Sequence, residues 1–200
     1  MNQKIKSTTF LIASCAVSTW ASAHTGVELH GDASFFSGLM HPLLGLDHLA
    51  AMLAVGIWSA LAARSAGPEL LWGPLGFANA LLLGAVIGMQ GVALPAVEPM
   101  IAASLLVMGL LVASRLRLPG GLAAALVGSF AVFHGLAHGQ ELAGSSSGFE
   151  AMAGMLSATL VLHATGIAVG WSMRGSRLWV GRMTGAAVAL WGGLLLLPLS

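Results

Sequence analysis

The segment HPLLGLDHLA contains three potential metal ligands, His41, Asp47 and His48, within eight residues. Imidazole nitrogens and carboxylate oxygens are ligands that divalent transition metals accept. Pro42 is tolerated in the first turn of a helix, so we expect a helix to begin near His41. On one continuous helix, His41 and His48 would lie two turns apart on the same face. Asp47 would then either complete their site or orient an imidazole by accepting its N–H.

A second segment, FHGLAHGQE, presents the same chemistry far away in the chain. His134 and His138 are four residues apart, and Glu141 follows three residues after His138. The three side chains therefore share one face of a helix. A histidine pair at this spacing is the way in which one helix offers two nitrogens to one metal ion.

Two further residues are candidate ligands, and each has an alternative role. Glu98, between Pro95 and Pro99, is either a ligand or a solvated loop acid. His163 lies in an apolar stretch, where it either contacts a passing ion or hydrogen-bonds a neighbouring helix. Ionisable groups at membrane depth are costly, which makes both residues functional candidates.

The composition indicates that lipid, rather than water, surrounds most of the chain. Of the 200 residues, 57% are hydrophobic and only 8% are charged, whereas a soluble domain carries about 25% charged residues. The net charge of +1 excludes a basic surface for nucleic acid. Lys4 and Lys6 are the only lysines, which excludes a nucleotide-binding loop of the GxxxxGK[ST] type.

Residues 1–23 have the features of a secretory signal peptide. Two N-terminal lysines precede a short apolar core at 10–17, and an A-x-A cleavage site ends at Ala23. Cleavage there leaves His24 as the mature N-terminus, whose amine and imidazole either chelate a divalent ion or belong to a mobile tail. An uncleaved membrane helix and lipoprotein processing at Cys15 are the alternatives. Cys15 is the only cysteine, so the mature protein would contain no disulfide and no thiolate ligand.

Six apolar stretches follow, each near the ~20 residues that cross a bilayer as a helix. They cover approximately residues 38–63, 70–90, 97–114, 119–139, 150–173 and 178–198. The predicted fold class is therefore all-α, a polytopic membrane protein in which residues 24–200 form one domain of six transmembrane helices. The patterns Gly84-x-x-x-Gly88 and Gly166-x-x-x-Gly170 predict close contacts between helices.

The arginines predict the orientation of the chain in the membrane. All six lie in or beside the first, third and fifth connections between the stretches, at Arg64, Arg115, Arg117, Arg174, Arg177 and Arg182. The positive-inside rule places these connections in the cytoplasm and the mature N-terminus in the periplasm, as expected for a multi-pass protein of a bacterial inner membrane. The same topology brings seven candidate ligands to the periplasmic side: His41, Asp47, His48, Glu98, His134, His138 and Glu141.

These motifs resemble those of the HupE/UreJ family of nickel permeases, which are encoded with hydrogenases and ureases. The resemblance covers essentially the whole mature chain and rests on three motifs: His41-Pro42-x-x-Gly45-x-Asp47-His48 followed by Met52-x-x-Val55-Gly56-x-Trp58, Phe133-His134-Gly135-x-Ala137-His138-Gly139-x-Glu141, and Leu162-His163-x-x-Gly166. It implies uptake of Ni²⁺, and in some members Co²⁺, by an energy-independent or secondary route. It also implies ligand roles for His41, Asp47, His48, His138 and Glu141, and extends them to Glu98 and His134.

The resulting hypothesis is a permease that imports a divalent metal, Ni²⁺ first and Co²⁺ second, for hydrogenase or urease maturation. Its expected partners are the lipid bilayer and the transported ion, without nucleic acid, catalysis or a permanently bound cofactor, and assembly as a homo-oligomer is left open. Alternatives are copper or zinc uptake by the same architecture and an electron carrier whose haem is held by His163 with His134 or His138. A metalloenzyme using Glu141 or Asp47 as a base is a further alternative.

Overall fold

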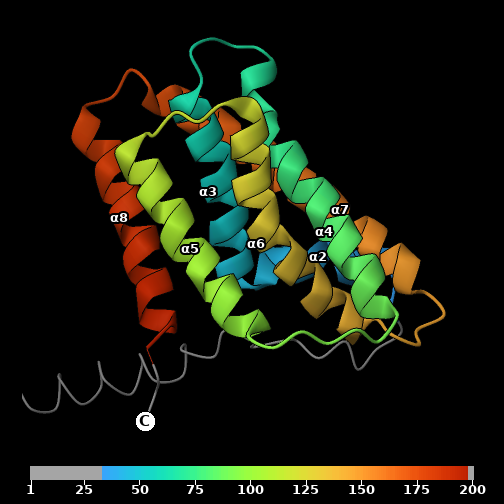
Figure 1. Cartoon of the computed structure of the whole chain (residues 1–200). Coiled ribbons are helices and arrows are strands. Elements are labelled where there is room, and N and C mark those ends of the chain that lie inside the picture. The colour runs from blue at the N-terminus through green and yellow to red at the C-terminus, as the bar shows by residue number, and fades with distance from the viewer. Residues whose placement is uncertain (1–32, 198–200) are drawn as a thin grey trace, which may run out of the picture.

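The computed structural model describes residues 33–197, and the regular secondary structure of this part of the chain consists of helices (Figure 1). The predicted signal peptide, its cleavage site and His24 lie outside the described residues. The helices are α2 (Phe35–Leu44), α3 (Leu46–Ala62), the 3₁₀ helix η1 (Pro68–Leu70), α4 (Trp72–Met89), α5 (Val97–Ser114), α6 (Gly120–Glu141), α7 (Gly148–Met173) and α8 (Leu178–Leu195).

Helices α4 to α8 are each long and apolar enough to cross a membrane, and α2 with α3 forms one bent pair that passes the same test. These elements follow the six predicted stretches, with α5 matching its stretch at both ends. The predicted all-α, polytopic organisation is confirmed at this level, and five to six apolar helices indicate a multi-pass membrane protein.

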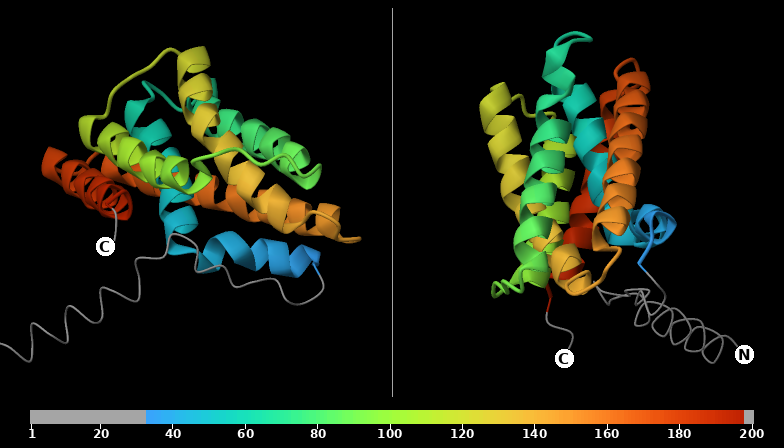
Figure 2. Two further views of the ribbon diagram at one scale, coloured as in Figure 1. Left: turned by 60° about the horizontal axis from the view of Figure 1, so that its bottom comes forward. Right: turned by 90° about the vertical axis from the view of Figure 1, so that its right-hand side faces the viewer.

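The first predicted span is not one continuous helix. The chain bends by 82° between α2 and α3, at Gly45, whose φ of −79° and ψ of 107° are extended rather than helical. Pro42 lies inside α2 near its end, not in a first turn, and its ring weakens the helix that precedes the bend. The expectation that His41 and His48 share a face of one helix is therefore wrong. Figure 2 shows α2, in blue, turned away from the axis of α3.

The start of α2 is fixed by a capping box. The Ser34 hydroxyl accepts the backbone N–H of Ser37 at 3.1 Å, and the Ser37 hydroxyl accepts the backbone N–H of Ser34 at 2.8 Å. This exchange satisfies donors that the first turn of a helix leaves unpaired. The short helix α2 therefore has a defined beginning as well as a defined end, which holds His41 in place.

Glycines bring the long helices into contact in pairs, α3 with α7, α4 with α6 and α5 with α8. A Cβ atom added to Gly88 would lie 2.5 Å from the Leu136 carbonyl oxygen of α6, and one added to Gly170 would lie 2.6 Å from the Ile57 carbonyl oxygen of α3. Gly84 and Gly166 approach the same helices equally closely. The predicted contacts of both glycine pairs are confirmed.

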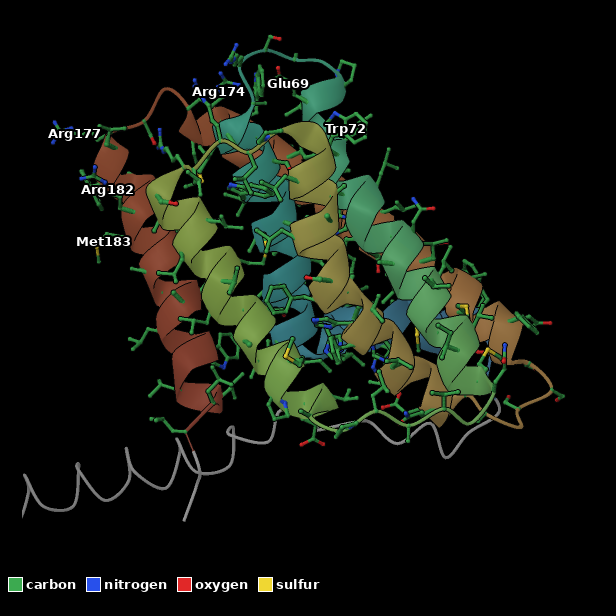
Figure 3. All side chains as sticks on the ribbon, viewed as in Figure 1. Glu69, Trp72, Arg174, Arg177, Arg182 and Met183 are labelled. Carbon is green, nitrogen blue, oxygen red and sulfur yellow. The ribbon has the colours of Figure 1, made fainter. Side chains whose placement is uncertain are left out.

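Arginines and histidines occupy opposite ends of the bundle. The Arg174 guanidinium donates to the Arg64 carbonyl at 3.0 Å, and Figure 3 shows Arg174, Arg177 and Arg182 at the end that also carries Glu69. Helix α3 runs from His48 in its first turn to Ala62 at this arginine end. Ser59 lies eleven positions after His48 on α3, which corresponds to about 16 Å along the helix axis.

Candidate metal centre

Three imidazoles from three helices meet at the end of the bundle away from the arginines. His41 of α2, His48 of α3 and His138 of α6 each offer a ligand nitrogen, and these nitrogens all lie within 4.8 Å of one another. His48 and His138 are buried and His41 is half-buried. With bonds of about 2.1 Å, ligand nitrogens of a tetrahedral site stand ~3.4 Å apart. A contraction of about an ångström would therefore let the three imidazoles share one ion.

The bend at Gly45 makes this convergence possible. The Gly45 N–H donates to the His41 carbonyl at 3.1 Å, and the Gly45 carbonyl accepts the Leu49 N–H at 2.9 Å, so both helix ends remain hydrogen-bonded through the bend. The ring centroids of His41 and His48 consequently lie 5.7 Å apart. A Cβ atom at position 45 would stand 3.1 Å from His48 Nδ1 and 3.2 Å from Asp47 Oδ1. Glycine leaves this space open.

Asp47 holds His48 through one of its two carboxylate oxygens. Its Oδ1 atom lies 2.9 Å from His48 Nδ1 and also accepts the His48 backbone N–H at 2.9 Å. Because a carboxylate only accepts, Nδ1 carries the proton and the lone pair of His48 is on Nε2. His48 Nε2 is buried and has no hydrogen-bond partner among the described residues. This arrangement is the carboxylate–histidine pair that supports metal-binding imidazoles.

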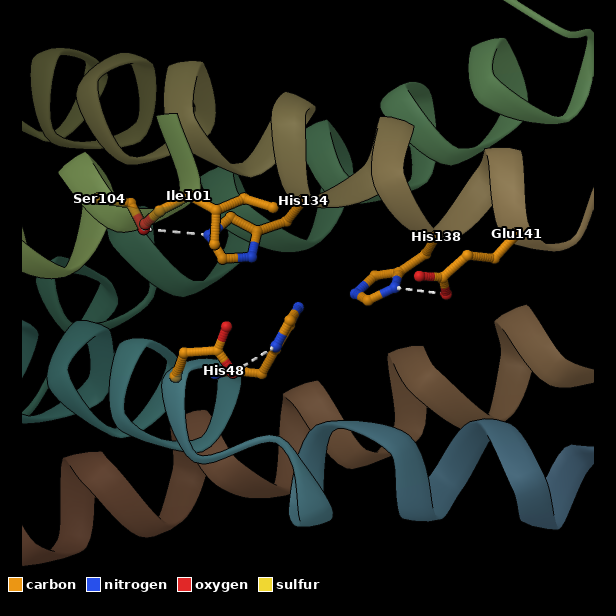
Figure 4. Close-up of polar contacts among 7 residues, drawn as sticks. His48, Ile101, Ser104, His134, His138 and Glu141 are labelled. Atoms are coloured by element: carbon orange, nitrogen blue, oxygen red, sulfur yellow. Dashed lines mark hydrogen bonds and ion pairs between the residues drawn. The ribbon is translucent and has the colours of Figure 1, made fainter. Parts of the chain in front are cut away.

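Glu141 repeats this relation on α6 at a longer distance. Its Oε2 atom lies 3.6 Å from His138 Nδ1, and its side chain is one-third exposed. Figure 4 shows the His138–Glu141 pair on the opposite side of the site from His48. The ring centroid of His138 lies 4.6 Å from that of His41 and 4.8 Å from that of His48. Helices α3 and α6 thus each supply an imidazole with a carboxylate beside it.

His134 lies next to this cluster and is fully buried. Its ring centroid is 5.3 Å from that of His48. The Ser104 hydroxyl donates to the Ile101 carbonyl at 2.6 Å, so its oxygen accepts the Nε2–H of His134 at 3.0 Å (Figure 4). This bond leaves the lone pair of His134 on Nδ1. Sequence reasoning missed Ser104, although a hydroxyl in an apolar stretch was a usable signal.

His163 lies deeper in the bundle, beyond an aromatic ring. Its carbonyl packs against Gly56 of α3, two turns past His48 and about 12 Å along the axis. Neither ring nitrogen of His163 has a hydrogen-bond partner among the described residues. The ring of Phe77 stands 5.1 Å from His163 and 5.6 Å from His134, measured between centroids. Sequence reasoning missed Phe77, because one phenylalanine in an apolar helix gives no signal.

The structure does not bring Glu98 into this cluster. Glu98 lies in the first turn of α5 and is exposed. Its ligand role stays a prediction, as does that of His24, which lies outside the described residues. The expected ligands that do come together are His41, His48 and His138, with Asp47, Glu141 and His134 around them.

Comparison with known proteins agrees with this pattern. The family model described as "HupE / UreJ protein" matches residues 12–195. The protein described as "Protein HupE" from Rhizobium leguminosarum bv. viciae is 41% identical over 196 residues, which cover 96% of this chain and 98% of that protein. No solved structure matches the chain. The matched region contains every helix of the described bundle, and the chain therefore belongs to the HupE/UreJ family.

Proposed function

We propose that this protein is a permease of the bacterial inner membrane that imports a divalent transition metal, Ni²⁺ or Co²⁺, for hydrogenase or urease maturation. The observation that carries the proposal is the convergence of His41, His48 and His138 at one end of a bundle of apolar helices. Membership of the HupE/UreJ family supports it further.

The orientation follows from the arginines. Under the positive-inside rule, the end of the bundle that carries Arg64 and Arg174 faces the cytoplasm. The histidine cluster then faces the periplasm, where it meets hydrated metal ions first. His41 is the half-buried member of the cluster, so it is the first imidazole that the entering ion contacts.

Capture of the ion is an exchange of water for imidazole. The ion binds the unprotonated nitrogens of the three histidines, and the carboxylates of Asp47 and Glu141 offset its charge while they orient His48 and His138. Imidazole without thiolate suits Ni²⁺, Co²⁺, Zn²⁺ and Cu²⁺ and disfavours Cu⁺. Copper or zinc uptake by the same site is therefore the alternative that the assay must test.

The inward path continues through His134 and His163. His134 receives the ion from His48, and Phe77 then closes the space before His163. The Phe77 ring must move aside for the ion to pass, which makes it a barrier between the outer cluster and the interior. The same ring fills the space between His134 and His163 that a haem held by these two residues would need.

The test is uptake of radioactive nickel into proteoliposomes that contain the purified chain, with cobalt, zinc or copper as competitors. We expect saturable nickel uptake that cobalt inhibits most strongly, and a rate near that of protein-free vesicles for His48→Ala. Glu150→Gln is the matched control, because Glu150 is an exposed residue in the first turn of α7. Wild-type uptake by His48→Ala at trace nickel would contradict the proposal, and stronger inhibition by copper or zinc would reassign the cargo.

A further inference from the structure

A cavity lies at the opposite end of the bundle from the histidine cluster. It has a volume of about 510 Å³ and lies between the end of α3 and the beginnings of α4 and α6. Its polar lining includes Ser59, Arg64, Glu69 and Arg117. It contains neither histidine nor cysteine, so its chemistry differs from that of the metal centre.

Two helix N-termini open into this cavity. Gly73 of α4 and Gly120 of α6 line it, and neither helix has a side-chain cap at its beginning. The first turn of each helix therefore presents backbone N–H groups without intrahelical partners, together with the positive end of the helix dipole. Two such ends in one cavity form a site that favours an anion.

The charged side chains of the cavity add to this preference. Within residues 33–197, no hydrogen bond or ion pair engages the guanidinium of Arg64 or Arg117. The Glu69 carboxylate accepts the Arg64 backbone N–H at 2.8 Å and fixes the loop. Two guanidiniums against one carboxylate leave a net positive lining. A guanidinium has donors and no lone pair, so this lining repels a metal cation.

The hydroxyl of Ser59 is an independent sign that the cavity holds a ligand. Ser59 is 5% exposed, and its Oγ atom has no hydrogen-bond partner in the described part of the chain. Ser59 is one of the residues that line the cavity, and its Oγ atom lies 2.9 Å from the position that a Cβ atom at Gly73 would take. Buried hydroxyls are nearly always hydrogen-bonded, so an unpaired one beside two helix N-termini calls for an acceptor from outside the chain.

We propose that this cavity binds a phosphate group, carried by an anionic phospholipid of the adjacent leaflet or by free phosphate. The guanidiniums of Arg64 and Arg117, the N–H groups of α4 and α6, and the Ser59 hydroxyl supply donors, and a phosphate supplies several acceptor oxygens. Trp72 lies across Gly120 at the rim and is half-exposed, as interfacial tryptophans are in membrane proteins. The site is separate from the transported metal and does not depend on which ion is carried.

The experiment compares phosphate sources on the full chain. Native mass spectrometry measures retention of phosphatidylglycerol against phosphatidylcholine, and calorimetry measures inorganic phosphate on the chain in phosphatidylcholine nanodiscs. We expect Arg64→Gln with Arg117→Gln to weaken binding by about tenfold or more, since two charge-assisted hydrogen bonds are lost. The control is Arg177→Gln with Arg182→Gln, which removes the same charge from the same end outside the cavity.

The possible outcomes distinguish the two sources of phosphate and also test whether the site exists. Selective retention of phosphatidylglycerol that only the cavity variant loses assigns a lipid, whereas binding of inorganic phosphate alone assigns a soluble source. Equal losses in the cavity variant and its control, or no binding of either probe by the unmodified chain, overturn the site. If the double variant does not fold, Ser59→Ala decides the question, because it removes one donor from a buried position. Unchanged affinity for both probes in Ser59→Ala would then refute the proposal.

Discussion

Replacing Asp47 by Asn tests whether this carboxylate acts on the metal through His48. Asp47 Oδ1 accepts two hydrogen bonds from His48, both 2.9 Å long, one of them from the ring. Asn keeps the shape but removes the charge, and a charge-assisted hydrogen bond is roughly twice as strong as a neutral one. The loss of such a supporting partner typically weakens metal binding by about 10- to 100-fold. We therefore expect a rise of this size in the dissociation constant for Ni²⁺.

The assay is equilibrium binding of radioactive nickel to the purified chain in detergent, with His48→Ala measured alongside. Glu150→Gln is the control for removal of one acidic residue, since Glu150 is exposed and lies on a different helix. A supporting role of Asp47 would be disproved if Asp47→Asn bound nickel as tightly as this control. It would also be refuted if Asp47→Asn lost as much binding as His48→Ala, because Asp47 would then be a direct ligand.

Three further predictions concern the bend, the barrier and the protonation of the site. Gly45→Ala should weaken nickel binding several-fold, because the added Cβ atom would stand 3.1 Å from His48 Nδ1. The melting temperature should change little, because the φ and ψ angles of Gly45 suit alanine. Wild-type affinity in this variant would argue against a role of Gly45 in leaving space for His48. Phe77→Ala should change the rate of nickel uptake more than the affinity for nickel. A time course of uptake and an equilibrium binding measurement on the same variant test this prediction. A loss of affinity alone would place Phe77 in the binding site instead. Nickel binding should weaken as the medium is acidified, because a protonated imidazole has no lone pair for the metal. An affinity that stays constant from pH 7.5 to pH 5.5 would be inconsistent with a site made of histidines.

The arrangement of the long helices could be predicted from the sequence because lipid imposes simple rules. A chain in lipid must satisfy its backbone internally, so each apolar stretch becomes a helix. Gly88 and Gly170 marked helix contacts, since only a residue without a side chain permits such close approach. The arginines marked one end of the bundle. From these rules, His48 and His138 could be assigned to the same end before their contact was seen.

The interior details could not be predicted in this way. The predicted stretch 38–63 runs across Gly45, and both glycine and proline occur in continuous membrane helices, so the 82° bend has no unique signature. The contact of Phe77 with His134 and His163 depends on the rotation of α4 against two other helices. That rotation depends on how α4 packs against the other helices, so the sequence of α4 alone does not predict it. For the same reason, the sequence could not show that an Asp47 oxygen lies within hydrogen-bond distance of the His48 ring.

We propose that the imidazoles of His41, His48 and His138 together bind the transported ion. X-ray absorption spectroscopy of the nickel-loaded chain tests this claim most directly, because imidazole ligands have a characteristic scattering pattern. We predict a nickel ion with three imidazole ligands in the wild-type chain and the loss of one imidazole contribution in His41→Ala. A spectrum with only oxygen ligands, or one that is unchanged in His41→Ala, would contradict the account.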